Sequence, residues 1–187
     1  MTRVVVLTAV DVEARGLARH LGLARVAGAT HPHFRAGALE LVCVGPGAGH
    51  LDARVGGLER PALLVSAAAC GALAPHLEEG ELVVPEAVLD AAGARHATAE
   101  VPGLRRRGTL LGVAAVVRAV SDPASRGVPP DLAALVEPDG RVRTAHAVRV
   151  ALARPRALAD ALALRSGTHA ALRSVARALA RLARAHA

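Results

Sequence analysis

The 187-residue chain contains no Lys, Ile, Asn, Gln, Trp or Tyr, and Phe34 is the one residue of the Phe, Trp and Tyr class. Its apolar residues are mostly Ala, Val and Leu, so the core must be built from aliphatic side chains with small contact areas. A ligand site would also lack the aromatic rings that usually stack on a purine. The composition therefore disfavours tight recognition of a nucleobase by stacking.

Cysteine is scarce as well, and Cys43 and Cys70 are not placed at a metal-type spacing. This argues against a disulfide framework and favours a reducing compartment. Nine histidines are scattered, with His31 and His33 as the one close pair, so we expect no metal site. The sequence shows no signal-peptide pattern and no apolar run of bilayer length. We therefore expect a cytoplasmic protein that is neither exported by a signal peptide nor membrane-spanning.

The hydrophobic fraction of 52% is enough for one substantial core. We expect a single domain over residues 1–187, with a sheet core over 1–125 and a helical C-terminal extension over 126–187. Apolar runs that alternate with helical patterns predict an α/β protein with three layers. The predicted strands are 4–10, 39–44, 63–67, 82–88 and 110–120. The predicted helices are 11–21, 49–58 and a long last helix from Thr168, after breaks at 138–140, Pro155 and 166–167.

Two segments without bulky side chains are candidates for ligand contact. Residues 67–72 are predicted to form a turn whose backbone could approach a small molecule closely; tight strand packing is the alternative. Residues 45–49, Gly-Pro-Gly-Ala-Gly, follow a predicted strand and precede a predicted helix, so their amides could face a phosphate or ribose oxygen. This second pattern matches neither a Walker loop nor a dinucleotide fingerprint, and a plain loop is the alternative.

Several stretches, in chain order, resemble the superfamily of purine nucleoside phosphorylases and methylthioadenosine-adenosylhomocysteine nucleosidases (MTAN). These are Asp-Val-Glu at 11–13, Cys-Gly-Ala-Leu-Ala-Pro at 70–75, Gly-Glu-Leu-Val-Val at 80–84, and Val-Val-Arg-Ala-Val-Ser-Asp at 116–122. The last stretch is the most specific. From Pro129 onward the chain is similar to the hopanoid-associated phosphorylase branch. The resemblance implies a nucleoside phosphorylase-like fold with a mixed, mostly parallel sheet, trimmed in the middle and closed by C-terminal helices.

The same resemblance implies an enzyme that cleaves the N-glycosidic bond of an adenosyl-type purine nucleoside, including one attached to a hopanoid. Asp122 would act as general acid toward the leaving base, at the carboxyl edge of the sheet where open α/β folds bind ligands. An Asx-type turn is the alternative for Asp122. Glu13 would activate the attacking water, and the alternative is a carboxylate favoured by the helix dipole. Asp11 is the expected N-cap of that helix.

The resemblance also assigns substrate-binding positions and leaves the nucleophile open. The substrate-binding residues would be Gly45, Gly47, Ala69, Cys70, Gly71 and Ser121. No cofactor is implied, and inorganic phosphate is an alternative co-substrate to water. Phosphorylases of this superfamily usually carry an arginine at the place of Ser66 and a serine at the place of Ala69, so hydrolysis is at least as plausible as phosphorolysis.

A larger departure lies between Leu104 and Val116. Family members insert there a helix and a strand with a Val-Glu-Met-Glu or Val-Asp-Met-Glu sequence, whose glutamate holds the ribose, and this chain has no such sequence. About one strand and one or two helices are predicted to be missing. A noncatalytic, degenerate homologue that binds a ligand or a membrane surface is therefore the competing hypothesis.

Charge is concentrated at the C-terminal end. Residues 1–140 hold 13 arginines against 15 acidic residues, whereas residues 141–187 hold 10 arginines against Asp160 alone. The last predicted helix is amphipathic and basic, with an apolar stripe flanked by arginines. It could contact an anionic membrane at the inner face, or it could pack on the domain with a solvated arginine face. Nucleic acid has less support, because no aromatic residues accompany the arginines. Homo-oligomers are implied by the relatives.

Overall fold

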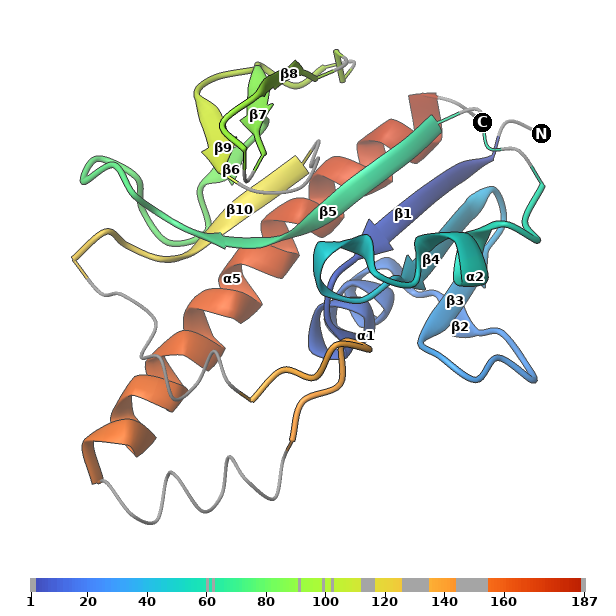
Figure 1. The fold of residues 1–187 in the computed structure, drawn as a ribbon, viewed down its shortest axis with the longest axis horizontal. Coiled ribbons are helices and arrows are strands. Elements are labelled where there is room, and N and C mark those ends of the chain that lie inside the picture. Colours follow the sequence, from blue (N-terminus) through green and yellow to red (C-terminus); the bar gives the residue numbers. More distant parts are fainter. Residues whose placement is uncertain are drawn as a thin grey trace.

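The computed structural model describes residues 3–59, 61, 63–90, 92–98, 100–101, 103–111, 117–125, 135–143 and 155–185. Its largest element is a seven-stranded sheet in the order β2-β3-β4-β1-β5-β10-β6 (Figure 1). The strands are β1 Val4–Thr8, β2 Ala24–Arg25, β3 His33–Ala36, β4 Leu39–Cys43, β5 Leu63–Gly71, β6 Leu82–Val83, β7 Ala87–Leu89, β8 Arg95–Ala97, β9 Thr109–Leu111 and β10 Val117–Asp122. The helices are α1 Asp11–Leu21, the 3₁₀ turn η1 Pro46–Ala48, α2 Leu51–Val55 and α5 Pro155–Ala185.

The central strands β4, β1, β5 and β10 are parallel to one another, whereas β3 pairs antiparallel with β4, β2 with β3, and β6 with β10 at the two sides. The prediction of a mixed, mostly parallel sheet is thus confirmed. A second sheet, ordered β8-β7-β9, stands apart from the first (Figure 1). Because the four central strands run the same way, their carboxyl ends share one edge, which is where ligands bind in such sheets.

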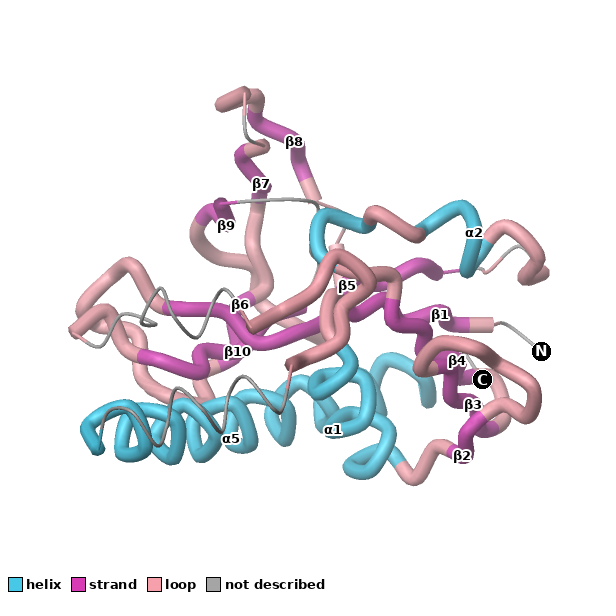
Figure 2. The backbone as a smooth tube through the Cα atoms, turned by 60° about the horizontal axis from the view of Figure 1, so that its bottom comes forward, coloured by secondary structure: helices cyan, strands magenta, loops and turns pink. Residues whose placement is uncertain are grey.

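Helices α1 and α5 lie on one face of the large sheet and α2 lies on the other (Figure 2). Alternation along β1 explains this, because Val4 and Val6 join the core under α1 and α5 while Val5 and Leu7 pack toward α2. All five residues of β1 are buried, as expected for a strand covered on both faces. The predicted three-layer α/β arrangement is confirmed.

Strand boundaries differ from the prediction where small residues occur. Strand β5 continues to Gly71, so the prediction of a turn over 67–72 is wrong. Pairing with β10 from Val117 onward keeps this alanine-rich stretch extended, which overrides its weak strand propensity. The predicted strand 82–88 is divided into β6 and β7, and the predicted strand 110–120 into β9 and β10. Residues 112–116 of the trimmed region lie outside the described part of the chain.

Helix α1 matches its predicted bounds and ends at Gly22, which adopts a left-handed conformation with φ 65°. Its N-cap is Val10 and not Asp11, so that prediction is wrong. Helix α2 is shorter than predicted. Helix α5 begins at Pro155, a favourable first position for proline, and continues through Gly167, where a break was predicted. The break prediction is wrong because α5 packs along β10 at this point, and glycine permits the close approach.

The apolar stripe of α5 packs into the core. The buried residues of the stripe are Leu172, Val175, Leu179 and Leu182, and the exposed arginines beside it are Arg173, Arg177, Arg181 and Arg184. The apolar side of α5 thus packs on the domain, as one of the two interpretations of this helix expected, and its arginine face is exposed to solvent. Among the described residues, no helix is both long and apolar enough to cross a membrane.

Candidate functional site

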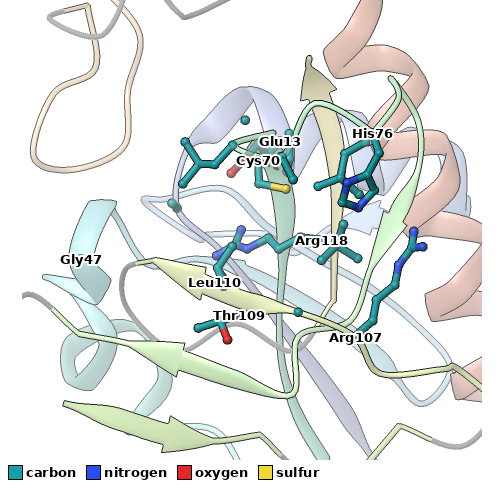
Figure 3. A pocket seen from close by; sticks show the side chains of 16 residues that line it. Glu13, Gly47, Cys70, His76, Arg107, Thr109, Leu110 and Arg118 are labelled. Carbon is teal, nitrogen blue, oxygen red and sulfur yellow. Dashed lines mark hydrogen bonds between the residues drawn. The ribbon is translucent and has the colours of Figure 1, made fainter. Parts of the chain in front are cut away.

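A cavity of about 860 Å³ lies beside β5 and β10 (Figure 3). The carboxyl end of β5 and Arg118, near the start of β10, line one side of it, and residues 107–110, which include the start of β9, line another. Helix α1 contributes Glu13, and the turn after β4 contributes Gly47. The volume falls in the range typical of small-molecule sites, roughly 300–1,000 Å³.

Among the described residues that line this cavity, Glu13 is the one carboxylate, and it is only 7% exposed. The backbone N–H of Ala69 donates to its Oε1 at 3.1 Å, and the N–H of Val10 donates to its Oε2 at 3.3 Å. Burial raises the pKa of Glu13 above its ordinary value of 4.5, an effect opposed by the charge of Arg118 and by these N–H donors. The result is a fixed, desolvated carboxyl group that holds a proton more readily than an exposed glutamate.

Arg118 extends from β10 into the middle of the cavity (Figure 3). Its Nη2 lies 3.4 Å from the hydroxyl oxygen of Ser66 on the neighbouring strand β5. Burial lowers the pKa of Arg118, and the negative charge of Glu13 opposes this shift. A positive and a negative group therefore face one another in a partly desolvated space, where electrostatic interactions are stronger than in water.

Arg118 was not among the predicted site residues, although it lies within the Val-Val-Arg-Ala-Val-Ser-Asp sequence. The available signal was its charge, because Arg118 interrupts the apolar run from Val113 to Val120. A charged side chain within a buried strand is costly unless it is paired, which makes such a position a candidate for function.

Asp122 and Ser121 are buried at the end of β10, 7% and 5% exposed. The Ser121 hydroxyl lies 2.5 Å from Oδ1 of Asp122 and 3.3 Å from the carbonyl oxygen of Cys70. Asp122 Oδ2 lies so close to Gly71 that a Cβ atom there would be 2.8 Å away. Gly71 and Cys70 line the cavity, whereas Asp122 and Ser121 stand directly behind this wall.

Cys70 lies where the charged groups converge. Burial raises the pKa of its thiol to about 11, and the charges of Arg118, Asp122 and Glu13 all act on it. A thiol with such a pKa stays protonated near neutral pH and is a poor nucleophile. Cys70 and its neighbour Ala69 line the wall of the cavity, and their contact with a substrate remains a prediction.

The predicted glycines Gly45 and Gly47 take different positions. Gly47 lines the main cavity and also a second one of about 250 Å³, which shares Ala9 and Arg118 with the first. Gly45 lines only the smaller of these two. It has φ 83°, and a Cβ atom at Gly45 would lie 2.8 Å from the carbonyl oxygen of Pro138. Packing against residues 135–143 therefore explains why glycine is needed at 45.

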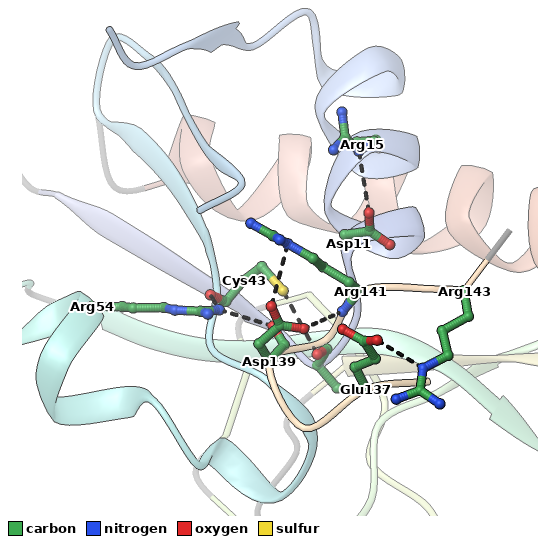
Figure 4. A network of polar contacts seen from close by, with 9 residues as sticks. Asp11, Arg15, Cys43, Arg54, Glu137, Asp139, Arg141 and Arg143 are labelled. Carbon is green, nitrogen blue, oxygen red and sulfur yellow. Dashed lines mark hydrogen bonds and ion pairs between the residues drawn. The ribbon is translucent and has the colours of Figure 1, made fainter. Parts of the chain in front are cut away.

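Residues 135–143 are tied to the sheet edge beside α1 (Figure 4). The Arg54 guanidinium donates to the carbonyl oxygens of Cys43 at 2.7 Å and Asp139 at 3.2 Å. The N–H of Asp11 donates to the carbonyl oxygen of Gly140 at 2.9 Å. These bonds fix the start of α1, two residues before Glu13, relative to the turn after β4.

The outer part of the cavity is lined by polar side chains that were not predicted: His76, Arg107 and Thr109. Arg107 forms an ion pair with Glu81. No sequence pattern around these residues distinguished them. Among the described residues, no group of three or more His, Cys, Asp and Glu side chains is arranged to hold a metal ion.

No protein-family model matches the chain, and no curated protein matches its sequence. Solved structures do match it over nearly the whole length. The 5'-methylthioadenosine nucleosidase of Arabidopsis thaliana in apo form aligns with a TM-score of 0.62 at 11% identity, covering 98% of this chain and 95% of that one. MTAN from Chlamydia trachomatis bound to adenine aligns with a TM-score of 0.60 at 10% identity, covering 100% of both chains.

A third structure is an Asp-to-Asn variant of Helicobacter pylori MTAN with 5'-methylthioadenosine in the active site. It aligns with a TM-score of 0.52 at 8% identity and covers 99% of both chains. At such identities the likeness concerns the backbone arrangement. The chain therefore has the α/β fold of the MTAN nucleosidases, with its cavity at the carboxyl edge of the sheet.

Proposed function

We propose that this protein hydrolyses the N-glycosidic bond of an adenosyl-type purine nucleoside. The observation that carries the proposal is the placement of Glu13 and Arg118 in one cavity, with Asp122 buried directly behind Gly71. Structures that share the fold bind adenine and 5'-methylthioadenosine, which supports the choice of substrate class.

Glu13 is the proposed general base. Its carboxylate lines the cavity, and its raised pKa brings it closer to neutral pH, which favours proton transfer from a weakly acidic water. The two N–H donors from Ala69 and Val10 fix its orientation. The positive charge of Arg118 opposes the effect of burial on the pKa of Glu13, which favours the ionised form that a base requires.

Asp122 is the proposed general acid. The Ser121 hydroxyl lies 2.5 Å from Oδ1 of Asp122 and 3.3 Å from the carbonyl oxygen of Cys70, so it can donate to either acceptor. Its bond to Oδ1 holds the Asp122 carboxyl group in place beside Gly71.

The reaction balances with water as the second substrate. The bond from C1' of the ribose to the base nitrogen breaks, and its electron pair stays with the base, which takes a proton from Asp122. The water oxygen bonds to C1', and Glu13 accepts the proton that this water loses. The purine and the free sugar leave, which is 5-methylthioribose when the substrate is 5'-methylthioadenosine. Glu13 then loses its proton to solvent and Asp122 regains one, which restores both groups.

The second cavity extends the site for a 5' substituent. It opens from the first at Gly47 and Arg118, and its lining includes Leu7, Leu51 and Leu64. Leu64 is 43% exposed, which is unusual for a large apolar side chain in a central strand. An apolar substituent on the ribose, with a hopanoid as the bulkiest case, would cover these side chains. A 5'-alkylthio nucleoside should therefore have a lower KM than adenosine.

The test measures release of adenine from 5'-methylthioadenosine by wild type, Asp122→Asn and an exposed control, Asp52→Asn. Loss of a general acid should lower kcat roughly 10²- to 10⁴-fold in Asp122→Asn. The Asp52 variant should match wild type, because Asp52 lies on α2 and is exposed.

The sugar product identifies the nucleophile. Free 5-methylthioribose in phosphate buffer supports hydrolysis, whereas 5-methylthioribose 1-phosphate would show that phosphate replaces water. Equal release by wild type and Asp122→Asn would remove the acid assignment. No adenine release by folded wild type, from either adenosine or 5'-methylthioadenosine, would favour the noncatalytic ligand-binding hypothesis.

A further inference from the structure

Helix α5 approaches strand β10 at Gly167 more closely than any side chain would allow. A Cβ atom at Gly167 would lie 1.8 Å from the carbonyl oxygen of Ser121 and 2.9 Å from its carbonyl carbon. Gly167 is buried, and both of these atoms belong to the backbone, so neither can rotate away. Because ordinary contact begins at 3.4 Å, an alanine would require a displacement of about 1.6 Å. Only glycine fits between the helix and the strand.

The contact falls on an irregularity of β10. The register between β10 and β5 shifts between Val120 and Asp122, so Ser121 is the extra residue of a bulge. The hydrogen bonds on both sides of it are intact. The N–H of Gly80 donates to the carbonyl oxygen of Val120 at 2.8 Å, and the N–H of Ala72 donates to that of Asp122 at 2.9 Å. Bulges of this kind redirect the side chains beside them.

The side chain redirected here is the Asp122 carboxyl. It lies against Gly71, where a Cβ atom would be 2.8 Å from Oδ2, and it is joined to the Ser121 hydroxyl at 2.5 Å. The dipeptide is thus confined from two sides by glycines. Gly71 leaves space for the carboxyl group, and Gly167 leaves space for the carbonyl oxygen of Ser121.

We propose that Gly167 is a positioning residue for Asp122, although it lies 45 positions later in the chain. Because Gly167 has no side chain, α5 packs directly on the bulge at Ser121 and thereby holds Asp122 in place. Its catalytic consequence rests on the proposed function, in which Asp122 is the general acid. A misplacement of about 1 Å at a reacting group can lower a rate roughly 10²-fold. The displacement that a side chain at 167 requires is of this size.

The test compares Gly167→Ala with Gly16→Ala. Gly16 lies on α1, and a Cβ atom there would meet Cδ1 of Leu172 on α5 at 2.5 Å. Both variants gain the same helix propensity, and both overfill a contact of α5. Only Gly167→Ala presses on the bulge. We expect kcat to fall roughly 10²-fold in Gly167→Ala with KM little changed, and Gly16→Ala to keep the wild-type kcat. Equal kcat values for the two variants would overturn the proposal.

A second measurement does not depend on enzymatic activity. The amides of Ala72 and Gly80 bond to the two sides of the bulge, so their hydrogen exchange reports its integrity. In Gly167→Ala both amides should exchange faster than in Gly16→Ala. The comparison is made at denaturant concentrations that give the two variants the same global free energy of unfolding. Unchanged protection would overturn the positioning role. If wild type releases no base, the proposed function fails, and this measurement still decides the role of Gly167.

Should Gly167→Ala not fold, native-state exchange of the wild type decides the question. The amides of Ala72 and Gly80 and those of α5 around Gly167 should then open with one common free energy as denaturant is added. Opening of α5 at a lower free energy, with Ala72 and Gly80 still protected, would overturn the proposal.

Discussion

Replacing Glu13 by Gln should lower activity and, at the same time, raise stability relative to wild type at neutral pH. Gln cannot take a proton from water, so kcat should fall roughly 10²- to 10⁴-fold, which corresponds to about 2.7–5.4 kcal/mol of barrier. In stability, Gln resembles the protonated glutamic acid. Each has one good acceptor for the N–H groups of Ala69 and Val10, and both are neutral donors, the acid through one O–H and Gln through its NH₂ group.

The sign of the stability effect follows from the pKa of Glu13, which burial raises above 4.5 in the folded protein. A raised carboxyl pKa means that the folded state binds the proton more tightly than the unfolded state. The stability that this provides is fully present below the unfolded pKa and is lost as pH rises through the folded pKa. Each unit of upward shift is worth about 1.4 kcal/mol. Wild type should therefore lose stability relative to Glu13→Gln as pH rises from 4.5.

The assay is urea unfolding of wild type, Glu13→Gln and the exposed control Glu86→Gln, at several values from about pH 4 to about pH 8. The stability difference between Glu13→Gln and wild type should be small at the acid end and should grow with pH, and its growth measures the shift directly. The Glu86 control should run parallel to wild type, because Glu86 is exposed. A difference for Glu13→Gln that stays constant over this range would refute the claim that Glu13 is desolvated.

Three further predictions concern other parts of the molecule. Arg118→Gln should move the acid limb of the pH–rate profile to higher pH, because Arg118 lowers the pKa of Glu13. An acid limb at the wild-type pH would show that Arg118 does not affect the pKa of Glu13. Leu179→Ala should cost about 2–5 kcal/mol in urea unfolding, since Leu179 is fully buried, whereas Leu162→Ala, at a 56% exposed position, should cost far less. The arginine face of α5 should bind anionic vesicles in a salt-sensitive way, and changing its arginines to Gln should abolish this binding. If binding is unchanged in the Gln variant, the arginine face is not the membrane-binding surface. These arginines are Arg173, Arg177, Arg181 and Arg184.

The sequence predicted the fold through its apolar runs, because a strand covered on both faces, such as β1, has no other composition available to it. It failed at positions where tertiary contacts decide the backbone. Strand β5 continues through Ala67–Gly71 because β10 lies beside it, and α5 continues through Gly167 because the glycine faces a backbone carbonyl. Local propensity carries no information about either neighbour, so single-sequence reasoning places a turn and a break there.

The candidate site divides along the same line. Glu13 and Asp122 could be proposed because the sequences around them resemble the MTAN superfamily, and the expected position of Asp122 at the carboxyl edge of the sheet agreed with that resemblance. The sequence could not show that Glu13 and Asp122 both lie near Gly71 and Cys70. Arg118 was missed because it lies within a strand that the sequence predicts to be buried. Residues 107–110 were missed because the sequence does not predict which strand pairs with this segment.

The small residues of β5 leave space for the side chains of Glu13, Arg118 and Asp122. Ala68 lies opposite Arg118 in the register, Ala69 donates its N–H to Glu13, and Gly71 faces the Asp122 carboxyl. A larger side chain at Gly71 would occupy the space of the carboxyl group, and one at Ala68 would compete with the Arg118 side chain on the same face of neighbouring strands. The alanine-rich composition that limits the contact area of the core thus also leaves, at the end of β5, room for Glu13, Arg118 and Asp122 to lie near one another around Cys70.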